Sequence, residues 1–178
     1  IYRLPELISS GGAAGNLLNG WWVSGILSLQ TGSPFSVSIT SDRARKKGGD
    51  NRPDLVSGRS NDNIIRGGPT QYFDPTAFAV QPAGFLGTAG RNILRGPGFA
   101  NLDFTLGKDT ALGFLGENGK LEFRAEFFNI LNRANFGIPI RTVYAAVRDG
   151  ESPLANAGKI QDTANTSRQI QFALKIVF

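Results

Sequence analysis

Hydrophobic and polar side chains alternate along several stretches of the chain. The clearest is RQIQFALKIVF at residues 168–178, where every second side chain, counted back from the last residue, is bulky and apolar. NLDFTLGK at 101–108 and KLEFRAEFFNILN at 120–132 alternate in the same way, and the stretch at 21–38, which opens with WWVSGILSLQ, does so less perfectly. A period of two places successive side chains on opposite faces of a strand. We therefore predict strands at these four places and interpret IYRL, residues 1–4, as the end of another strand.

The connections between the predicted strands are of two kinds. GGAAGNLLNG, around 11–20, and GFLGENG, at 113–119, are short and rich in Gly and Asn, which is typical of turns. Residues 40–100 and 137–167 are long and show no sustained period. If successive strands alternate in direction, the short turns share one end and the long loops share the other. This pattern predicts an all-β fold of antiparallel up-and-down strands, forming a segment of a transmembrane β-barrel with long extracellular loops.

Composition favours strands and removes most catalytic chemistry. The 178 residues include 23 Gly, 9 Pro and 13 Phe, which favours strands joined by turns. Cys, Met and His are all absent, which removes disulfides, thiolate nucleophiles, imidazole bases and the usual zinc ligands. No apolar run reaches the roughly 18 residues of a transmembrane helix, so a closed barrel is what remains for crossing lipid. We expect no enzyme activity, no catalytic or metal-binding residue and no cofactor.

One face of the strand at 120–132 carries a row of charges. Lys120, Glu122, Arg124 and Glu126 alternate with apolar side chains. At a rise of about 3.3 Å per residue, neighbours on one face lie roughly 6.6 Å apart, which allows a ladder of ion pairs. Such a row faces either bulk water or a water-filled lumen, while the opposite face meets a core or lipid. We expect these four residues to form a lumen-facing charge ladder.

Several other patterns suggest functional sites but have simpler explanations. Glu122 and Glu126 lie about 13 Å apart along a strand, beyond the roughly 5–9.5 Å of glycosidase carboxylates. GRNILRGPGFAN lacks the helix and the Lys-Ser/Thr of a phosphate loop. The acidic residues of the loop at 42–54 match no EF-hand spacing. We interpret all three as structural or solvated.

The net charge of +5 does not indicate a nucleic-acid partner. The one basic cluster, Arg43, Arg45, Lys46 and Lys47, is flanked by aspartates and carries no stacking aromatics, so we interpret it as a solvated loop.

Two tryptophans begin the strand at 21–38. Because Trp21 and Trp22 follow a short turn, we expect them to be interfacial aromatic residues at the edge of a bilayer. A weaker alternative is that aromatic side chains stack on sugars in a soluble carbohydrate-binding sandwich.

Several blocks of the chain resemble a known family. FRAEFFNILNRANFG followed by the terminal RQIQFALKIVF, and upstream WWVSGILSLQTGSPFSV and FDPTAFAVQPAGFLGTAGRNILRGPGFANLDFTL, resemble the C-terminal end of a TonB-dependent outer-membrane receptor. The likeness is to the Oar-like group, which carries an N-terminal carboxypeptidase-regulatory-like domain, and it covers nearly the whole chain. The resemblance implies a barrel segment of a transporter in the bacterial outer membrane, which moves a solute inward with energy from the inner membrane.

The resemblance also implies partners. The terminal strand would be the β-signal read by the barrel-assembly machinery, with Phe172, Leu174, Ile176 and Phe178 as its apolar positions. Outer-membrane lipid and the rest of the barrel would surround the segment, and TonB would act through an N-terminal part. The plug and TonB box of the family are not found in these residues. The chain begins without Met, and we expect residue 1 to be an internal position of a longer precursor.

The small number of strands leaves a second hypothesis open. About eight strands are the working minimum for a closed barrel, and the four and a half predicted here leave open edges. Exposed regular edges recruit partners. The alternative is a processed C-terminal fragment whose copies pair through these edges into an extracellular tube or fibre at the cell surface.

Overall fold

The computed structural model describes residues 1–9, 12–48 and 51–178, which fold as two compact units. The strand unit consists of Ile1–Leu29, Ala100–Ala134 and Thr166–Phe178. The loop unit consists of Gln30–Phe99 and Asn135–Asn165. Each unit is therefore assembled from segments that are separated in the sequence.

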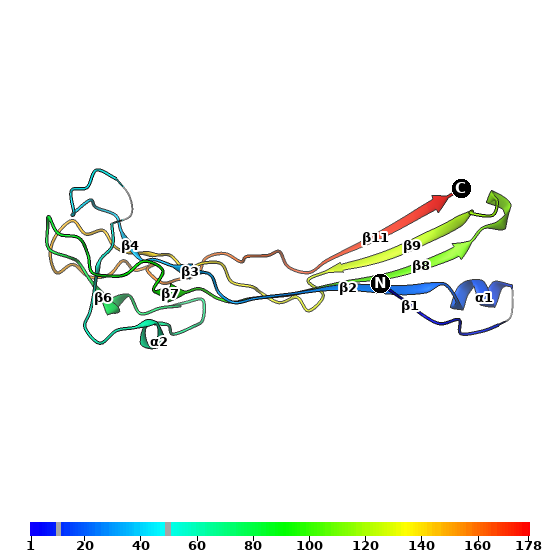
Figure 1. Cartoon of the computed structure of the whole chain (residues 1–178), viewed down its shortest axis with the longest axis horizontal. Helices are drawn as coiled ribbons and strands as arrows, with labels where there is room; N and C mark the ends of the chain where they lie inside the picture. The colour runs from blue at the N-terminus through cyan, green and yellow to red at the C-terminus, as the bar shows by residue number, and fades with distance from the viewer. Residues whose placement is uncertain (10–11, 49–50) are drawn as a thin grey trace. The chain divides into compact units, whose positions relative to one another are not determined.

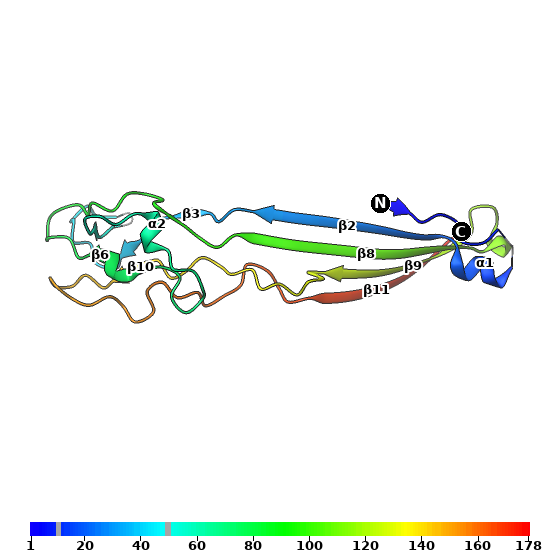
Figure 2. The ribbon, with the colours of Figure 1, turned by 90° about the horizontal axis from the view of Figure 1, so that it is seen from below.

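The strand unit is built on one five-stranded sheet with the order β1-β2-β8-β9-β11 (Figure 1). Its strands are β1 (Tyr2–Arg3), β2 (Trp21–Gln30), β8 (Phe99–Ala111), β9 (Lys120–Phe128) and β11 (Gln169–Val177). β1 pairs antiparallel with β2, and β9 pairs antiparallel with both β8 and β11. Figure 2 shows β2 and β8 running in opposite directions. The all-β fold with antiparallel strands is confirmed.

The sheet is regular where the sequence alternates most strictly. β11 pairs with β9 along its whole length, from Gln169 opposite Phe128 to Val177 opposite Lys120. Because side chains alternate between faces, this register places the apolar positions of both strands on one face and the polar positions on the other. The rings of Phe123 and Phe172 stack on the apolar face with centroids 6.3 Å apart.

Some strand boundaries differ from the prediction. The strand expected at 21–38 ends at Gln30, where Gly32 lies against the carbonyl of Gly96 with no space for a side chain, and Pro34 follows without a backbone donor. The strand expected at 120–132 ends at Phe128, because Asn129 and Asn132 take φ values of 50° and 49° and turn the chain. The strand expected at 101–108 extends in both directions to Phe99–Ala111.

Both short connections contain helical turns, where we predicted only turns. α1 (Ala13–Leu18) lies in the first and is closed by the amide of Asn19, which donates to the carbonyl of Gly15. The 3-10 helix η2 (Gly113–Leu115) lies in the second. Among the described residues, no helix is long and apolar enough to cross a membrane.

The loop unit contains short elements around a core of its own. Its described residues form three two-stranded sheets, one helix and one 3-10 helix. They are β3 (Pro34–Phe35) with β7 (Leu94–Arg95), β4 (Ser38–Ile39) with β10 (Thr142–Tyr144), β5 (Asp54–Leu55) with β6 (Phe78–Ala79), α2 (Asn61–Ile64) and η1 (Pro75–Ala77). β4 and β10 run parallel, which departs from the antiparallel pattern.

The core of the loop unit joins its two segments. Phe73 lies at its centre, with ring centroids 5.9 Å from Phe35 and 6.3 Å from Phe78. Val143 and Tyr144 pack into the same buried cluster from the second segment, and the Tyr144 hydroxyl donates to the carbonyl of Phe78 at 2.5 Å. The long loops at 40–100 and 137–167 therefore pack around a common core, although their sequences show no periodic pattern.

Candidate functional site

The polar face of the strand unit carries the predicted charge ladder as a continuous row of ion pairs. Lys120 Nζ lies 3.7 Å from Glu122 Oε2, and Glu122 Oε1 lies 3.1 Å from Arg124 Nε. Arg124 Nη1 lies 3.7 Å from Glu126 Oε1. These side chains are partly exposed, so each pair is expected to contribute only about 0–1 kcal/mol by itself. The row links the four side chains into one network on this face.

The ion-paired face continues across neighbouring strands. Asp109 on β8 lies opposite Glu122 and 3.9 Å from Lys120 Nζ. Arg3 on β1 reaches the same Asp109 carboxylate at 3.2 Å, and Trp22 Nε1 donates to it at 3.3 Å. Sequence reasoning missed Arg3 and Asp109, because their place in the row depends on the cross-strand register. Positive and negative groups alternate throughout, so the face is polar without a large charge of one sign.

The two tryptophans lie on opposite faces of the sheet. The Trp22 ring covers Gly107, at the place that a β-carbon on that residue would occupy, and so lies among the charges. Trp21 lies on the apolar face, where Lys108 Nζ is 5.5 Å from its ring centroid. The register therefore places the two side chains in different surroundings, and the interfacial role stays a prediction for both.

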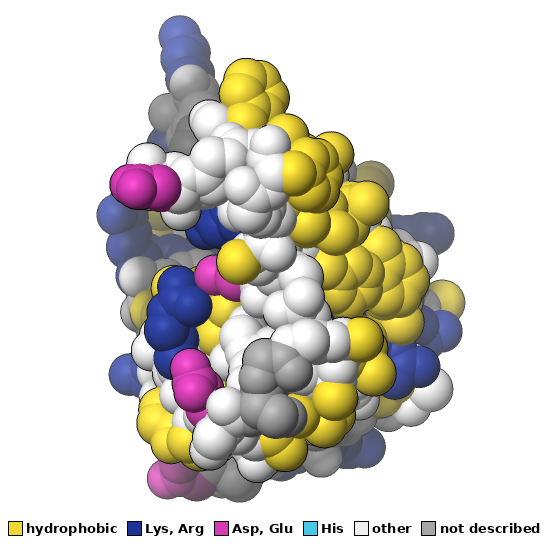
Figure 3. Space-filling view, turned by 90° about the vertical axis from the view of Figure 1, so that its right-hand side faces the viewer, with side chains coloured by type: hydrophobic (Ala, Val, Ile, Leu, Met, Phe, Trp, Pro, Cys, Tyr) yellow, Lys and Arg dark blue, Asp and Glu magenta, His cyan; other side chains and the backbone are white. Residues whose placement is uncertain are grey.

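The apolar face is exposed in the strand unit. Phe172, Leu174 and Ile176 on β11 are 69%, 68% and 55% exposed, and Leu29 on β2 is 68% exposed. Figure 3 looks at the end that carries the short connections, where hydrophobic side chains in the foreground gather on one side and acidic and basic ones on the other. A contiguous apolar surface of this kind marks contact with a membrane or another protein. Phe178, the last predicted β-signal position, follows the end of β11 and is 91% exposed.

In the loop unit, one carboxylate organises the surrounding chain. Asp74 is buried and accepts hydrogen bonds from Thr76 Oγ1 at 2.6 Å and from the Thr76 backbone amide at 3.0 Å. Arg66 Nη2 donates to its other oxygen at 2.8 Å. Burial by itself raises the pKa of Asp74, but these hydrogen bonds and the positive charge of Arg66 outweigh it and lower the pKa below its ordinary value.

The basic loop is less solvated than predicted. The Arg43 side chain is buried, donates from Nε to the carbonyl of Gln81 at 2.9 Å and pairs with Asp149. Arg45 is exposed, as expected for a solvated loop. Asp42 accepts from the backbone amides of Lys46 and Lys47, so its carboxylate closes the turn. No group of three or more His, Cys, Asp or Glu side chains able to hold a metal ion occurs among the residues described.

Comparison with known proteins agrees with this geometry. A family model described as an outer membrane beta barrel domain matches residues 1–171. No curated protein and no solved structure matches the chain. The match spans both units, so it includes the packed loop segments as well as the strands.

Proposed function

Because this chain belongs to the outer membrane beta barrel domain family, and so lies in the bacterial outer membrane, we propose that it is a barrel segment of a TonB-dependent transporter of the Oar-like group. Its role is mechanical: the strand unit supplies wall and lumen lining, and the loop unit supplies extracellular structure. The family indicates a structural or transport role and not catalysis.

The two-faced sheet carries this proposal. One face exposes Phe172, Leu174 and Ile176, and the other holds the row of ion pairs around Glu122 and Arg124. In a membrane wall the first face meets lipid tails, and the second meets the water of a lumen. Lipid offers no hydrogen-bond partners, so the backbone of every strand must be satisfied by neighbouring strands.

The margins of the sheet support the partners that we propose for this role. β1 and β11 are the outermost strands, and within the described residues neither pairs on its outer side. Five strands cannot close into a barrel, so we propose that further strands of the same barrel complete it. β11 then serves as the β-signal for the barrel-assembly machinery, with Phe172, Leu174, Ile176 and Phe178 as the positions that are read.

The finer assignment rests on the sequence blocks. FRAEFFNILNRANFG, which spans most of β9 and the turn after it, and the terminal block of β11 resemble Oar-like TonB-dependent receptors. From this resemblance we propose inward transport of a solute with energy passed on by TonB, through a plug and an N-terminal part of the receptor.

Cysteine accessibility tests the wall and lumen roles. The 178 residues contain no cysteine, so Leu174→Cys and Ala173→Cys each place a single thiol within them, on the apolar and the polar face of one strand. In outer membranes holding the full-length gene product, we expect a charged, hydrophilic maleimide to label the residue 173 variant and a lipid-soluble maleimide to label the residue 174 variant. Equal labelling of both by the hydrophilic reagent would overturn the assignment of the faces.

Energy coupling needs a separate experiment. A photo-crosslinking residue introduced into the N-terminal part of the full-length gene product should give a cross-linked species with TonB in living cells. The same species should be lost when TonB is deleted, while the labelling pattern of residues 173 and 174 is unchanged. A barrel with the expected labelling but without cross-linking would retain the family role and exclude TonB-dependent transport.

The unpaired margins also favour a second candidate function. Copies of the chain could pair through β1 and β11 into an extracellular tube or fibre at the cell surface. Electron microscopy of the purified chain separates the two: polymers would support the alternative, and single particles in detergent would support the barrel segment.

A further inference from the structure

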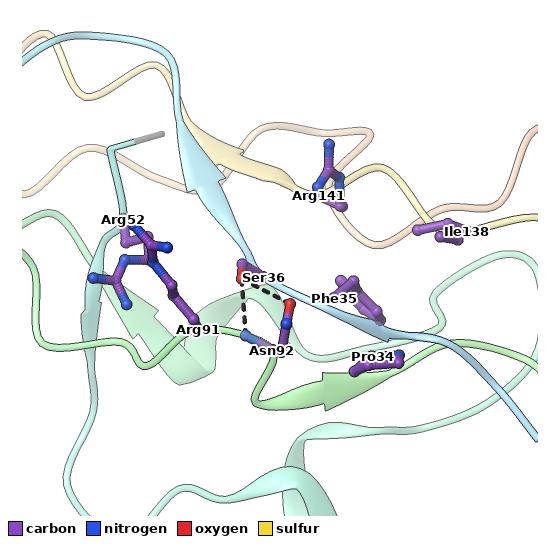
Figure 4. Close-up of a pocket in the computed structure, with 8 residues that line it drawn as sticks. All are labelled: Pro34, Phe35, Ser36, Arg52, Arg91, Asn92, Ile138 and Arg141. Atoms are coloured by element: carbon purple, nitrogen blue, oxygen red, sulfur yellow. Dashed lines mark hydrogen bonds between the residues drawn. The ribbon is translucent and has the colours of Figure 1, made fainter. Parts of the chain in front are cut away.

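The loop unit contains a pocket whose two sides differ in chemistry (Figure 4). Its volume is about 350 Å³, which lies at the lower end of the range typical of small-ligand sites. Phe35 and Ile138 give it an apolar part, while three arginines, Arg52, Arg91 and Arg141, give it a strongly cationic part. In Figure 4 the side chains of Arg52 and Arg91 lie on one side of Ser36, and that of Arg141 lies on the other.

The three arginines reach the pocket from separate parts of the chain. Arg52 precedes β5, Arg91 precedes β7, and Arg141 precedes β10. Arg52 Nη1 donates to the carbonyl of Ala89 at 2.7 Å, which anchors this guanidinium through one of its nitrogens. Arg91 and Arg141 are exposed. The positive charges therefore meet through the fold and not through a basic run in the sequence.

Three other arginines of the same unit have carboxylate partners, and the pocket arginines do not. Arg43 pairs with Asp149, and both Arg59 and Arg66 pair with Asp74. Within the described ranges, neither Arg52, Arg91 nor Arg141 forms an ion pair, and no Asp or Glu lines the pocket. Like charges gathered at one place repel, and an anion bound between them would remove that repulsion.

The wall between the arginines is held in place. The Asn92 backbone amide donates to Ser36 Oγ at 2.8 Å, and the Ser36 hydroxyl lies 3.3 Å from Asn92 Oδ1. Asn92 adopts a φ of 54°, and Phe35 is only 3% exposed, being part of the core. The pocket thus has a buried, hydrogen-bonded floor beside the arginine side chains, which is the arrangement that recognises a small ligand by a few polar contacts.

We propose that this pocket binds a small organic anion that carries two or more carboxylate or phosphate groups next to an apolar part. Guanidinium groups bind such oxygens in a bidentate manner, and more than one of them can share a multivalent anion. The apolar part of the ligand lies against Phe35 and Ile138. This inference goes beyond the role as a barrel segment and holds whether or not transport depends on TonB.

Calorimetry on the full-length protein in detergent tests the inference. The probes are benzene-1,2,4-tricarboxylate, citrate and inorganic phosphate, with benzamide as the uncharged control. We expect the aromatic tricarboxylate to bind more tightly than citrate, inorganic phosphate to bind weakly and benzamide not at all, with affinity falling as salt rises. Micelles of short-chain phosphatidylglycerol present phosphate oxygens on a lipid. Tighter binding of these micelles than of the free anions would overturn the proposal that the pocket binds a small soluble anion.

Three single variants and one double variant locate the binding site. Arg91→Gln and Arg141→Gln should each weaken tricarboxylate binding about tenfold, the equivalent of about 1.4 kcal/mol. Arg148→Gln removes an exposed positive charge from the same unit outside the pocket and should leave affinity unchanged. Equal affinity of the wild type and the double Arg91 and Arg141 variant, or no binding of any anion, would overturn the proposal. The heat-dependent gel mobility of the same samples reports barrel assembly, so a failed barrel is distinguishable from an empty pocket.

Discussion

At the scale of single residues, Gly107 and Trp22 show how closely the polar face is packed. A β-carbon at residue 107 would overlap the indole of Trp22, whose Nε1 donates to Asp109. We expect Gly107→Ala to push the ring away and destabilise the folded protein by about 1–3 kcal/mol, which is the usual cost of overpacking. The midpoint of urea unfolding in detergent measures this.

Two matched variants accompany that measurement. Gly113→Ala adds the same methyl group at a glycine with no atom of the described chain within 4 Å of the added carbon, and should change the midpoint little. In a Trp22→Ala background, Gly107→Ala should lose most of its effect. An unchanged cost in that background would show that the overlap with the indole is not its origin.

A second residue-scale prediction concerns Asp74 and pH. Hydrogen bonds from Thr76 and Arg66 hold the pKa of Asp74 below the ordinary value of 3.8. A lowered folded pKa means that the unfolded state binds protons first, so this contribution is fully present above the ordinary value and is lost as pH falls through the folded pKa. We expect amide exchange of residues 64–78, corrected for intrinsic rates, to stay constant down to about pH 5 and to accelerate as pH falls below it.

Asp74→Asn removes the titrating group and should abolish that part of the pH dependence. Asp62→Asn removes an exposed carboxylate from the same unit and serves as the control, with wild-type behaviour expected. If exchange accelerates equally in the Asp74→Asn variant and in the wild type, other titrating groups cause the effect.

At the scale of elements, β11 alternates between bulky apolar positions on one face and positions on the polar face of the sheet. Leu174 lies opposite Phe123 on the apolar face, whereas Gln171 lies opposite Glu126 on the polar face. We expect Leu174→Lys to destabilise the barrel by about 2–4 kcal/mol if the residue lies near the membrane midplane. Gln171→Lys places the same charge beside a carboxylate and should be tolerated.

The amount of folded protein in outer-membrane fractions and its unfolding midpoint measure both variants. An equal loss of folded protein in both variants would show that β11 tolerates no added charge on either face, which would contradict the two-faced arrangement.

The elements differ in how far the sequence predicts them. β9 and β11 follow from alternation alone, because a period of two fixes both the strand and its faces. The end of β2 does not, because the close approach of Gly32 to the carbonyl of Gly96, far along the chain, has no signal in the local pattern. Likewise, Asp109 joins the row of ion pairs only through its register opposite Glu122.

The loop unit was the least predictable part for a related reason. Its core residues, among them Phe35, Phe73, Phe78 and Val143, are irregularly spaced and come from two distant segments. A periodic pattern reveals the buried face of a strand or helix only when the element is long enough to repeat it. These side chains belong to elements only two to four residues long or to none. The pocket arginines were missed because each stands alone in the sequence.

At the scale of the whole molecule, the two units have separate sheets and separate sets of packed residues. Within the strand unit, β2 lies next to β8 in the sheet, and β9 lies next to β11. Short hairpin turns can therefore replace the long segments that connect the strands of each pair. We expect a variant with residues 31–98 and 135–165 each replaced by a two-residue Asn-Gly turn to assemble as a heat-modifiable barrel.

The same variant should lose all binding of the aromatic tricarboxylate. Replacing only residues 135–165 is the informative comparison, because it removes Val143 and Tyr144 from the core and should leave residues 31–98 sensitive to protease in an intact barrel. Failure of the double replacement to assemble would show that the strands depend on the loop unit.

The parallel pairing of β4 with β10 sets an order of maturation. The segment that holds Phe73 is synthesised long before the one that holds Tyr144, yet their side chains share one buried cluster. We therefore expect the earlier segment to stay incompletely folded during barrel assembly until β10 reaches β4. Until then its aromatic side chains are available to chaperones and proteases, so the arrival of residues 142–144 ends the period in which the assembling chain is most vulnerable.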